Sequence, residues 1–247
     1  MNTVTQPADA RPLGATLPDW QPASRPQRTP LLGERVRLEP LSAERHGDSL
    51  FAAFQLPGEG PHDTPQARWA YSGGMSFSDA EQCHAWLAER ARSEDPLFFA
   101  IVEAESGRAL GLASYLNIVP EHGSIEVGHI HFTPALRRTP AATEAMLLMM
   151  RHAFALGYRR YEWKCDALNA ASRRAAERLG FRFEGIFRQH RVVNGRNRDT
   201  AWFSLLDGEW PAVETQLERW LAAENFDDEG RQRSSLSALS ALSALSA

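Results

Sequence analysis

Cysteine is scarce in this chain of 247 residues, which holds only Cys83 and Cys165, far apart in the sequence. Two isolated cysteines provide neither a disulfide framework nor a cysteine-based metal cluster. This usage favours a reducing compartment, so we expect a cytoplasmic protein that carries no metal. Long apolar runs are also lacking, because no stretch approaches the roughly 20 residues that a membrane helix needs, and the N-terminus shows no basic-then-apolar signal pattern.

An excess of positive charge is absent as well. The chain has 27 Lys and Arg against 31 Asp and Glu, for a net charge of -4. Since nucleic-acid binding depends largely on basic surfaces, a nucleic-acid partner is not favoured. With 43% hydrophobic residues, the composition is that of a globular protein with a sizeable core.

The two ends of the chain differ in composition from its body. Residues 1–30 are rich in proline and poor in apolar residues, and we interpret them as a flexible arm. The last stretch, 226–247, ends in repeats of Leu-Ser-Ala, whose period of three does not match the 3.6 of a helix. We expect this tail to be disordered and low in complexity, which leaves 31–225 as the folded domain.

Periodicity and turn signals predict an α+β fold for the body. The chain would form a mixed, mostly antiparallel sheet of seven strands with helices on both faces. Asn194-Gly195 is a strong type I′ hairpin signal, and Ser78 with Glu81 reads as a capping box. The expected strands are 36–41, 97–103, 109–118, 124–133, 161–166, 181–193 and 198–206, and the expected helices are 42–55, 78–93, 140–157, 169–180 and 211–224.

The stretch from His129 to Leu156 is the most informative part of the sequence. It reads as the end of a strand, a short turn with Arg137 and Arg138, and a helix with Thr139 as N-cap and Pro140 at its first position. Free amides and the positive end of the helix dipole would make this turn an anion site, suited to a pyrophosphate. An ordinary strand–helix junction with two solvated arginines is an equally good interpretation of the stretch alone.

Three local features together resemble the GNAT acetyltransferase superfamily over roughly residues 31–221. The first, Arg137-Arg-Thr-Pro-Ala-Ala142, is similar to the acyl-CoA turn Q/R-x-x-G-x-G/A, with Pro140 in place of the first glycine. The second is a helix opened by Asn169 and closed by Leu179-Gly-Phe181, and the third is Phe183-Glu-Gly-Ile-Phe-Arg188 before the hairpin. The order is closest to the RimJ/RimL-type branch, named for enzymes that acetylate ribosomal-protein N-termini.

This resemblance implies acetyl-CoA as co-substrate and direct attack of an amine on its thioester. It also implies a central strand pair that splays apart, with the pantetheine arm bound in the gap and an oxyanion donor among the backbone N–H groups near His131. Asn169 would both cap its helix and contact pantetheine. The implied cofactor-binding residues are His131, Phe132, Arg137, Arg138, Thr139, Ala141, Ala142, Thr143 and Asn169.

The resemblance also suggests catalytic residues. Glu126 stands where this branch often places an acidic residue and could remove the amine proton through water, although a carboxylate paired with a basic residue is equally plausible. Ser172 could face the thiol end or be a solvated helix serine. His129 and His131 are reserve bases on the opposite face of the strand. Many relatives use a tyrosine as general acid seven residues after the asparagine, where this chain has Ala176.

The expected function is N-acetylation of a primary amine, either a protein N-terminus or a small molecule. A non-catalytic CoA-binding module is the alternative, since Ala176 replaces the usual acid. The branch also suggests a homodimer. The charge-dense Arg196-Asn-Arg-Asp-Thr200 beside the hairpin is a candidate contact for an acidic acceptor, with a solvated hairpin as the more common alternative.

Overall fold

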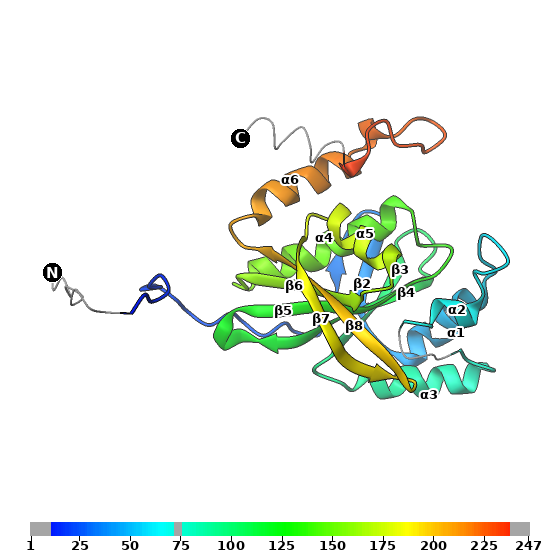
Figure 1. Ribbon diagram of the computed structural model, residues 1–247. Helices are drawn as coiled ribbons and strands as arrows, with labels where there is room; N and C mark the ends of the chain where they lie inside the picture. Colours follow the sequence, from blue (N-terminus) through cyan, green and yellow to red (C-terminus); the bar gives the residue numbers. More distant parts are fainter. Residues whose placement is uncertain (1–10, 72–75, 238–247) are drawn as a thin grey trace.

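The protein is described by a computed structural model that covers residues 11–71 and 76–237 (Figure 1). One sheet of eight strands, in the order β1-β2-β3-β4-β5-β6-β8-β7, runs through the molecule. The strands are β1 (Leu31–Leu32), β2 (Val36–Pro40), β3 (Leu97–Glu103), β4 (Ala109–Val119), β5 (Ser124–Phe132), β6 (Arg160–Asp166), β7 (Arg182–Val193) and β8 (Arg196–Leu206).

The topology confirms the mixed, mostly antiparallel sheet, because among the described strands only β5 and β6 pair in parallel. A parallel pair needs a crossover, and the helix between these two strands supplies it. The sheet has eight strands rather than the expected seven. The additional strand, Leu31–Leu32, is only two residues long and carries no alternation that a pattern search could detect.

The helices are α1 (Ala43–Gln55), α2 (Pro65–Arg68), α3 (Ala80–Ala91), α4 (Pro140–Ala155), α5 (Ala170–Arg178) and α6 (Trp210–Leu221). As expected, the side chains of Ser42, Thr139 and Asn169 cap their helices by accepting a backbone N–H. The predicted capping box at Ser78 is wrong. Asp79 is the N-cap of α3, and Ser78 donates instead to its carboxylate.

Two hydrophobic clusters cover the two faces of the sheet. On one face α4, α5 and α6 pack over residues such as Ile125, Val127 and Phe203. On the other face α1 and α3 pack over residues such as Phe98 and Ala100. Figure 1 shows α4 and α5 on one side of the strands and α1 with α3 on the other, so the sheet is covered on both faces.

The most consequential feature of the sheet is the parting of β5 and β6. Their pairing runs from Ser124↔Arg160 to Val127↔Trp163 and then stops. Beyond that point β5 continues to Phe132 and β6 to Asp166 without pairing to each other. This is the splayed central strand pair implied by the resemblance, and it leaves a gap in the middle of the molecule.

The segments that flank the body contact it. The backbone N–H of Ala23 donates to Pro120 O (3.1 Å), and that of Ser24 donates to Leu156 O (2.8 Å). After α6, the indole of Trp220 donates to Gln232 (2.9 Å), and Leu236 is buried. Residues 1–10, expected to be flexible, and residues 238–247, expected to be disordered, lie outside the described part of the chain.

We propose that residues 31–225 fold on their own and that the flanking segments add stability. Removing residues 1–30 should then lower Tm by about 4–8 °C, because two backbone hydrogen bonds are worth about 2 kcal/mol together and each kcal/mol shifts Tm by about 2–4 °C at this size. Calorimetry of the truncated and full chains measures the shift. Loss of the cooperative transition would show instead that the arm is part of the folding unit.

Candidate active site

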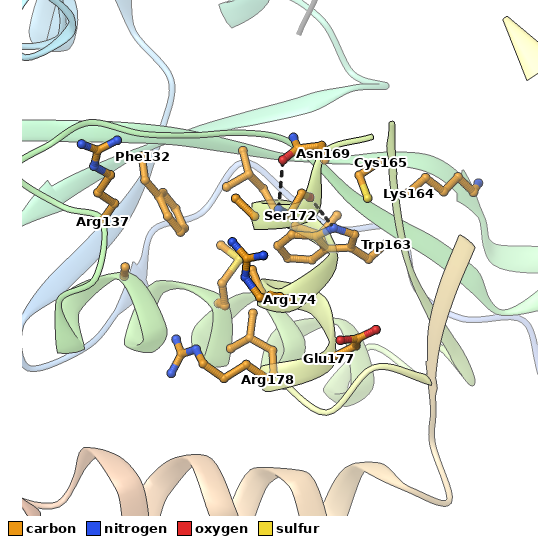
Figure 2. A pocket seen from close by; sticks show the side chains of 18 of the residues that line it. Phe132, Arg137, Trp163, Lys164, Cys165, Asn169, Ser172, Arg174, Glu177 and Arg178 are labelled. Carbon is orange, nitrogen blue, oxygen red and sulfur yellow. Dashed lines mark hydrogen bonds between the residues drawn. The ribbon is translucent and has the colours of Figure 1, made fainter. Parts of the chain in front are cut away.

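A cavity of about 1520 Å³ occupies the gap between β5 and β6. At one end it is lined by the turn before α4, by α4 and by α5. At the other end it is lined by β4, β5, β7 and β8. Figure 2 shows the side chains of α5 and of β6 that converge on it. The cavity brings together most of the residues singled out from the sequence.

The turn between β5 and α4 has the geometry of an anion site. The amides of Leu136 and Arg137 both donate to Thr133 O, which folds the chain tightly, and Arg138 adopts a left-handed φ of 62°. Thr139 then caps α4, and Pro140 occupies its first turn. A helix of 16 residues therefore directs its positive end at the turn.

Fewer amides are free in this turn than the sequence predicts. The N–H of Thr139 donates to Leu136 O, and that of Ala142 donates to the Thr139 hydroxyl. Pro140 has no N–H. Within the described part of the chain, the amides of Arg138 and Ala141 have no protein acceptor, so these two are the donors available to a phosphate.

Both arginines of the turn are held by carboxylates from a distant loop. Arg137 forms an ion pair with Asp63, and Arg138 forms one with Glu59. The loop between α1 and α2 that carries these acids has no sequence signature that would place it here. A bound phosphate would compete with Glu59 and Asp63 for the same guanidinium groups.

Strand β5 carries a bulge where it passes the cavity. Ser114 on β4 pairs with Gly128, but Leu112 pairs with His131, so one additional residue lies in β5. His129 has a φ of 48°, and its Nδ1 lies 2.8 Å from the Ser114 hydroxyl. The bulge interrupts strand pairing and re-aims side chains. Gly128, His129, Ile130 and Phe132 consequently line the cavity.

The same bulge separates the two histidines that strict alternation places together. His129 lines the cavity, whereas the His131 ring is buried at 6% exposure and stacks on Trp69 at 3.8 Å. Burial, with a smaller contribution from the Arg68 charge, lowers the pKa of His131 to about 3. His131 is therefore neutral at physiological pH, and its side chain does not reach the cavity.

Glu126 lines the cavity at 5% exposure and is bound by two donors. Asn117 Nδ2 lies 2.5 Å and Lys164 Nζ 2.9 Å from its Oε2. Burial raises the pKa of this carboxyl, and Lys164 and Asn117 act against that rise. The arrangement combines both sequence interpretations of Glu126, because the carboxylate is ion-paired and also adjoins the cavity.

Helix α5 presents Asn169 and Ser172 to the cavity. Asn169 Oδ1 accepts the N–H of Ser172 (3.0 Å), and the Ser172 hydroxyl accepts the indole N–H of Trp163 (3.0 Å), as Figure 2 shows. Because the hydroxyl oxygen already accepts, its proton is left to donate elsewhere. Asn169 and Ser172 lie in the same cavity as the phosphate turn.

The position at which the family's tyrosine is expected does not face the cavity. Ala176 is fully buried in the core beneath α5, and Ala175 is the residue that lines the cavity next to Ser172. Helical geometry explains this, because the side of α5 that lines the cavity holds residues 171–172, 174–175 and 177–178, which leaves Ala176 on the side that faces the core. Ser172 and Glu177 are the side chains with an exchangeable acidic proton that α5 presents to the cavity.

Several cavity residues were not identified from the sequence. Trp163, Lys164 and Cys165 follow one another on β6, and the strand pattern does not distinguish them. Cys165 is buried, and burial raises the pKa of its thiol, so it is protonated at neutral pH. Asn117, His190 and Arg191 also line the cavity. Nothing in their local sequence marks them, since strand pairing and bulges bring them there.

No group of metal-binding side chains occurs among the described residues. None of the helices in the described ranges is both long and apolar enough to span a bilayer.

Comparison with known proteins identifies the family. The sequence model of the acetyltransferase (GNAT) domain matches residues 35–182. A GCN5-related N-acetyltransferase from Brucella melitensis is similar in structure, with 48% identity and a TM-score of 0.86 over 90% of this chain and 99% of its own. A probable GNAT-family acetyltransferase from Chromobacterium violaceum has 44% identity and a TM-score of 0.73 over 82% and 98%.

A more distant fold neighbour is the microcin C7 self-immunity acetyltransferase MccE, in complex with acetyl-CoA and AMP. It has 16% identity and a TM-score of 0.57 over 70% of this chain and 93% of its own. The comparison with curated proteins gave no match. The chain belongs to the GNAT acetyltransferase family, whose members transfer the acetyl group of acetyl-CoA.

The turn can be tested by removing its charges. Replacing Arg137 and Arg138 together by alanine should weaken acetyl-CoA binding at least about tenfold, because charge-assisted hydrogen bonds to phosphate are lost. Calorimetric titration of the folded variant measures the change. Glu59→Gln with Asp63→Asn is the matched control, since it breaks the same ion pairs but keeps both arginines and should not weaken binding. Equal affinity of the alanine variant and the wild type would rule out this placement.

Proposed function

We propose that this protein is an acetyl-CoA-dependent N-acetyltransferase that acetylates a primary amine, either a protein N-terminal α-amine or a small-molecule amine. One observation carries the proposal. A single cavity runs from the anion-binding turn before α4, through the gap between β5 and β6, to the buried carboxylate of Glu126. Such a path lets a thioester held at the turn lie beside an amine held near Glu126.

We assign the protein to the RimJ/RimL-type branch of the family. The support is local, namely an acidic residue at position 126, with no tyrosine supplied to the cavity by α5. A homodimer and a cytoplasmic location are part of the same proposal. The location is supported by two cysteines that are both free and buried.

In the proposed complex, the pyrophosphate of acetyl-CoA binds the amides of Arg138 and Ala141 and the two arginine side chains. The pantetheine arm pairs with the unpaired backbone of β5 between residues 128 and 132, as an added strand does. Asn169 contacts the arm from the start of α5, beside Phe132. Thr143 is buried and does not line the cavity; its hydroxyl accepts a hydrogen bond from Arg178, which does. A backbone N–H near His131 stabilises the oxyanion that forms on the thioester carbonyl.

The proposed reaction needs one base and one proton donor. The amine nitrogen attacks the carbonyl carbon, the C–N bond forms, and the C–S bond then breaks. Glu126 accepts the proton of the amine through water. The departing thiolate takes a proton from the Ser172 hydroxyl, which the indole of Trp163 orients by donating to its oxygen at 3.0 Å, and solvent returns a proton to Ser172.

A site whose base is one ion-paired carboxylate favours an α-amine over a lysine side chain as the acceptor. An α-amine has a pKa of about 7.7–8.0 and is partly neutral at pH 7, whereas a lysine amine has a pKa of about 10.4. A single carboxylate already bound by Lys164 can deprotonate the first kind of amine more easily. Acceptors with a low amine pKa should therefore be the better substrates.

The role of Glu126 can be tested by Glu126→Gln, which should lower kcat by about 10²–10⁴ and leave acetyl-CoA affinity unchanged. A base must be deprotonated, and burial raises the pKa of Glu126, so the acidic limb of the wild-type kcat profile should lie above the ordinary pKa of 4.5. The variant should lose that limb. The measurement is kcat against pH on matched α-amine and lysine-type acceptors.

Full activity of the Glu126 variant would make the carboxylate structural and leave His129 as the nearest alternative base. Faster turnover of lysine-type acceptors at neutral pH would contradict the α-amine preference independently of Glu126.

The alternative is a non-catalytic CoA-binding module of the same fold. The observation that favours it is the absence of a tyrosine on the cavity face of α5, where Ser172 and Ala175 stand. A thiol-release assay with a panel of amines distinguishes the two. Acetyl-CoA binding without thiol release for any amine would support the module.

A further inference from the structure

The end of the cavity opposite the phosphate turn is rich in basic side chains. Lys164 from β6, His190 and Arg191 from β7, and Arg198 from β8 all line it. From the sequence, all residues of the charged stretch 196–200 were equal candidates for contact with the acceptor. The structure distinguishes them, because Arg198 and Thr200 line the cavity and Arg196 does not.

A second bulge brings the β7 residues to the cavity. Phe187 pairs with Thr200 and Arg191 pairs with Arg198, so four steps along β7 match only two along β8. Gln189 takes a φ of 51° in this bulge, and its N–H donates to Asp199 (2.7 Å). Bulges of this kind re-aim side chains beside binding sites.

The bulge also fixes the direction of His190. Its Nδ1 lies 2.9 Å from the Thr200 hydroxyl, and its ring contacts Phe187 and Trp202. Both His190 and Thr200 line the cavity, so this small cluster forms a defined wall beside the two arginines.

The two arginines lack the carboxylate partners that the neighbouring lysine has. Lys164 lies 2.9 Å from Glu126 and 2.8 Å from Glu162. In the described ranges, neither Arg191 nor Arg198 has an ion-pair partner, and the buried Nε of Arg198 has no hydrogen-bond acceptor. Asp166, a carboxylate at the same end, accepts the N–H of Leu168 (2.9 Å).

Loss of solvation and the charges of these basic residues lower the pKa of the neighbouring His190. The pKa of His190 is lowered by loss of solvation first and then by Arg191, Arg198 and Lys164. Arg191 is exposed, whereas Arg198 is half-buried, and a partly buried cation without a counter-charge is unfavourable in a free protein. A ligand that supplies an anion removes that cost, and guanidinium groups bind carboxylate and phosphate oxygens with two parallel hydrogen bonds.

We propose that the acceptor is a primary amine that also carries an anionic group, a carboxylate or a phosphate, and that Arg191 and Arg198 bind this group. The inference rests on the proposed function and narrows its substrate class. The amine lies in the gap beside Glu126, and the anion extends from it along the cavity to β7 and β8. Phosphates of acetyl-CoA occupy the other end, at Arg137 and Arg138.

The test compares acceptors that differ by one charged group. Phosphoethanolamine is paired with ethanolamine, and alanyl-aspartate amide is paired with alanyl-asparagine amide. In the wild type, kcat/KM should be at least about tenfold higher for the charged member of one pair, and the pair that responds identifies phosphate or carboxylate. Arg191→Gln with Arg198→Gln should bring that ratio close to one.

Arg196→Gln is the matched control, because it removes a positive charge from the same hairpin outside the cavity and should keep the wild-type ratio. A wild-type ratio near one for both pairs would overturn the proposal. A rise in the KM for acetyl-CoA that accounts for the whole loss in the double variant would also overturn it, by assigning the arginines to CoA.

If no probe is acetylated, that result counts against the proposed function. The anion site can still be tested by measuring how tightly the probes bind. Calorimetry on the CoA-saturated protein should then show tighter binding of one charged probe than of its neutral partner, and the double variant should lose the difference. Equal binding, or no binding, of charged and neutral probes would overturn the anion site itself.

Discussion

The site depends on one interruption of hydrogen bonding, the end of β5–β6 pairing after Val127↔Trp163. In the interior of a sheet, unpaired backbone groups are costly unless a ligand or water satisfies them. Here the bulge at His129 draws β5 away from β6, and α4 and α5 line the opening with side chains. The cavity and the open strand edge both follow from this parting.

The charged side chains of the cavity are paired differently in its different parts. The phosphate turn has two arginines that the protein itself neutralises with Glu59 and Asp63. The middle has Glu126, whose partner Lys164 also pairs with Glu162. At the far end, the arginines of β7 and β8 lack protein partners among the described residues. A substrate with its amine in the middle and its anion at the far end would complement this order.

The sequence predicts the fold well because its signals are local. Alternation in the strands, Thr139 and Asn169 as helix caps, and Asn194-Gly195 with φ of 50° and 70° all act within a few residues. Long-range features were missed for a physical reason. Ion pairs such as Arg137 with Asp63 join segments 74 residues apart, and no local pattern encodes them.

Bulges account for most of the remaining differences between the site expected from the sequence and the site in the structure. A one-residue bulge reverses the side-chain alternation of a strand, so His131 moved into the aromatic core while His129 stayed at the cavity. The bulge in β7 likewise placed His190 and Arg191 in the site. On α5, an offset of one position separates the buried Ala176 from Ala175 at the cavity.

The central claim is that the open edge of β5 and the turn before α4 hold acetyl-CoA together. Amide hydrogen exchange, measured with and without acetyl-CoA, tests it most directly. The account predicts that binding slows exchange in residues 128–132 and at Arg138 and Ala141, because these amides gain acceptors or are shielded from solvent. Saturating acetyl-CoA that leaves exchange in both segments unchanged would contradict it.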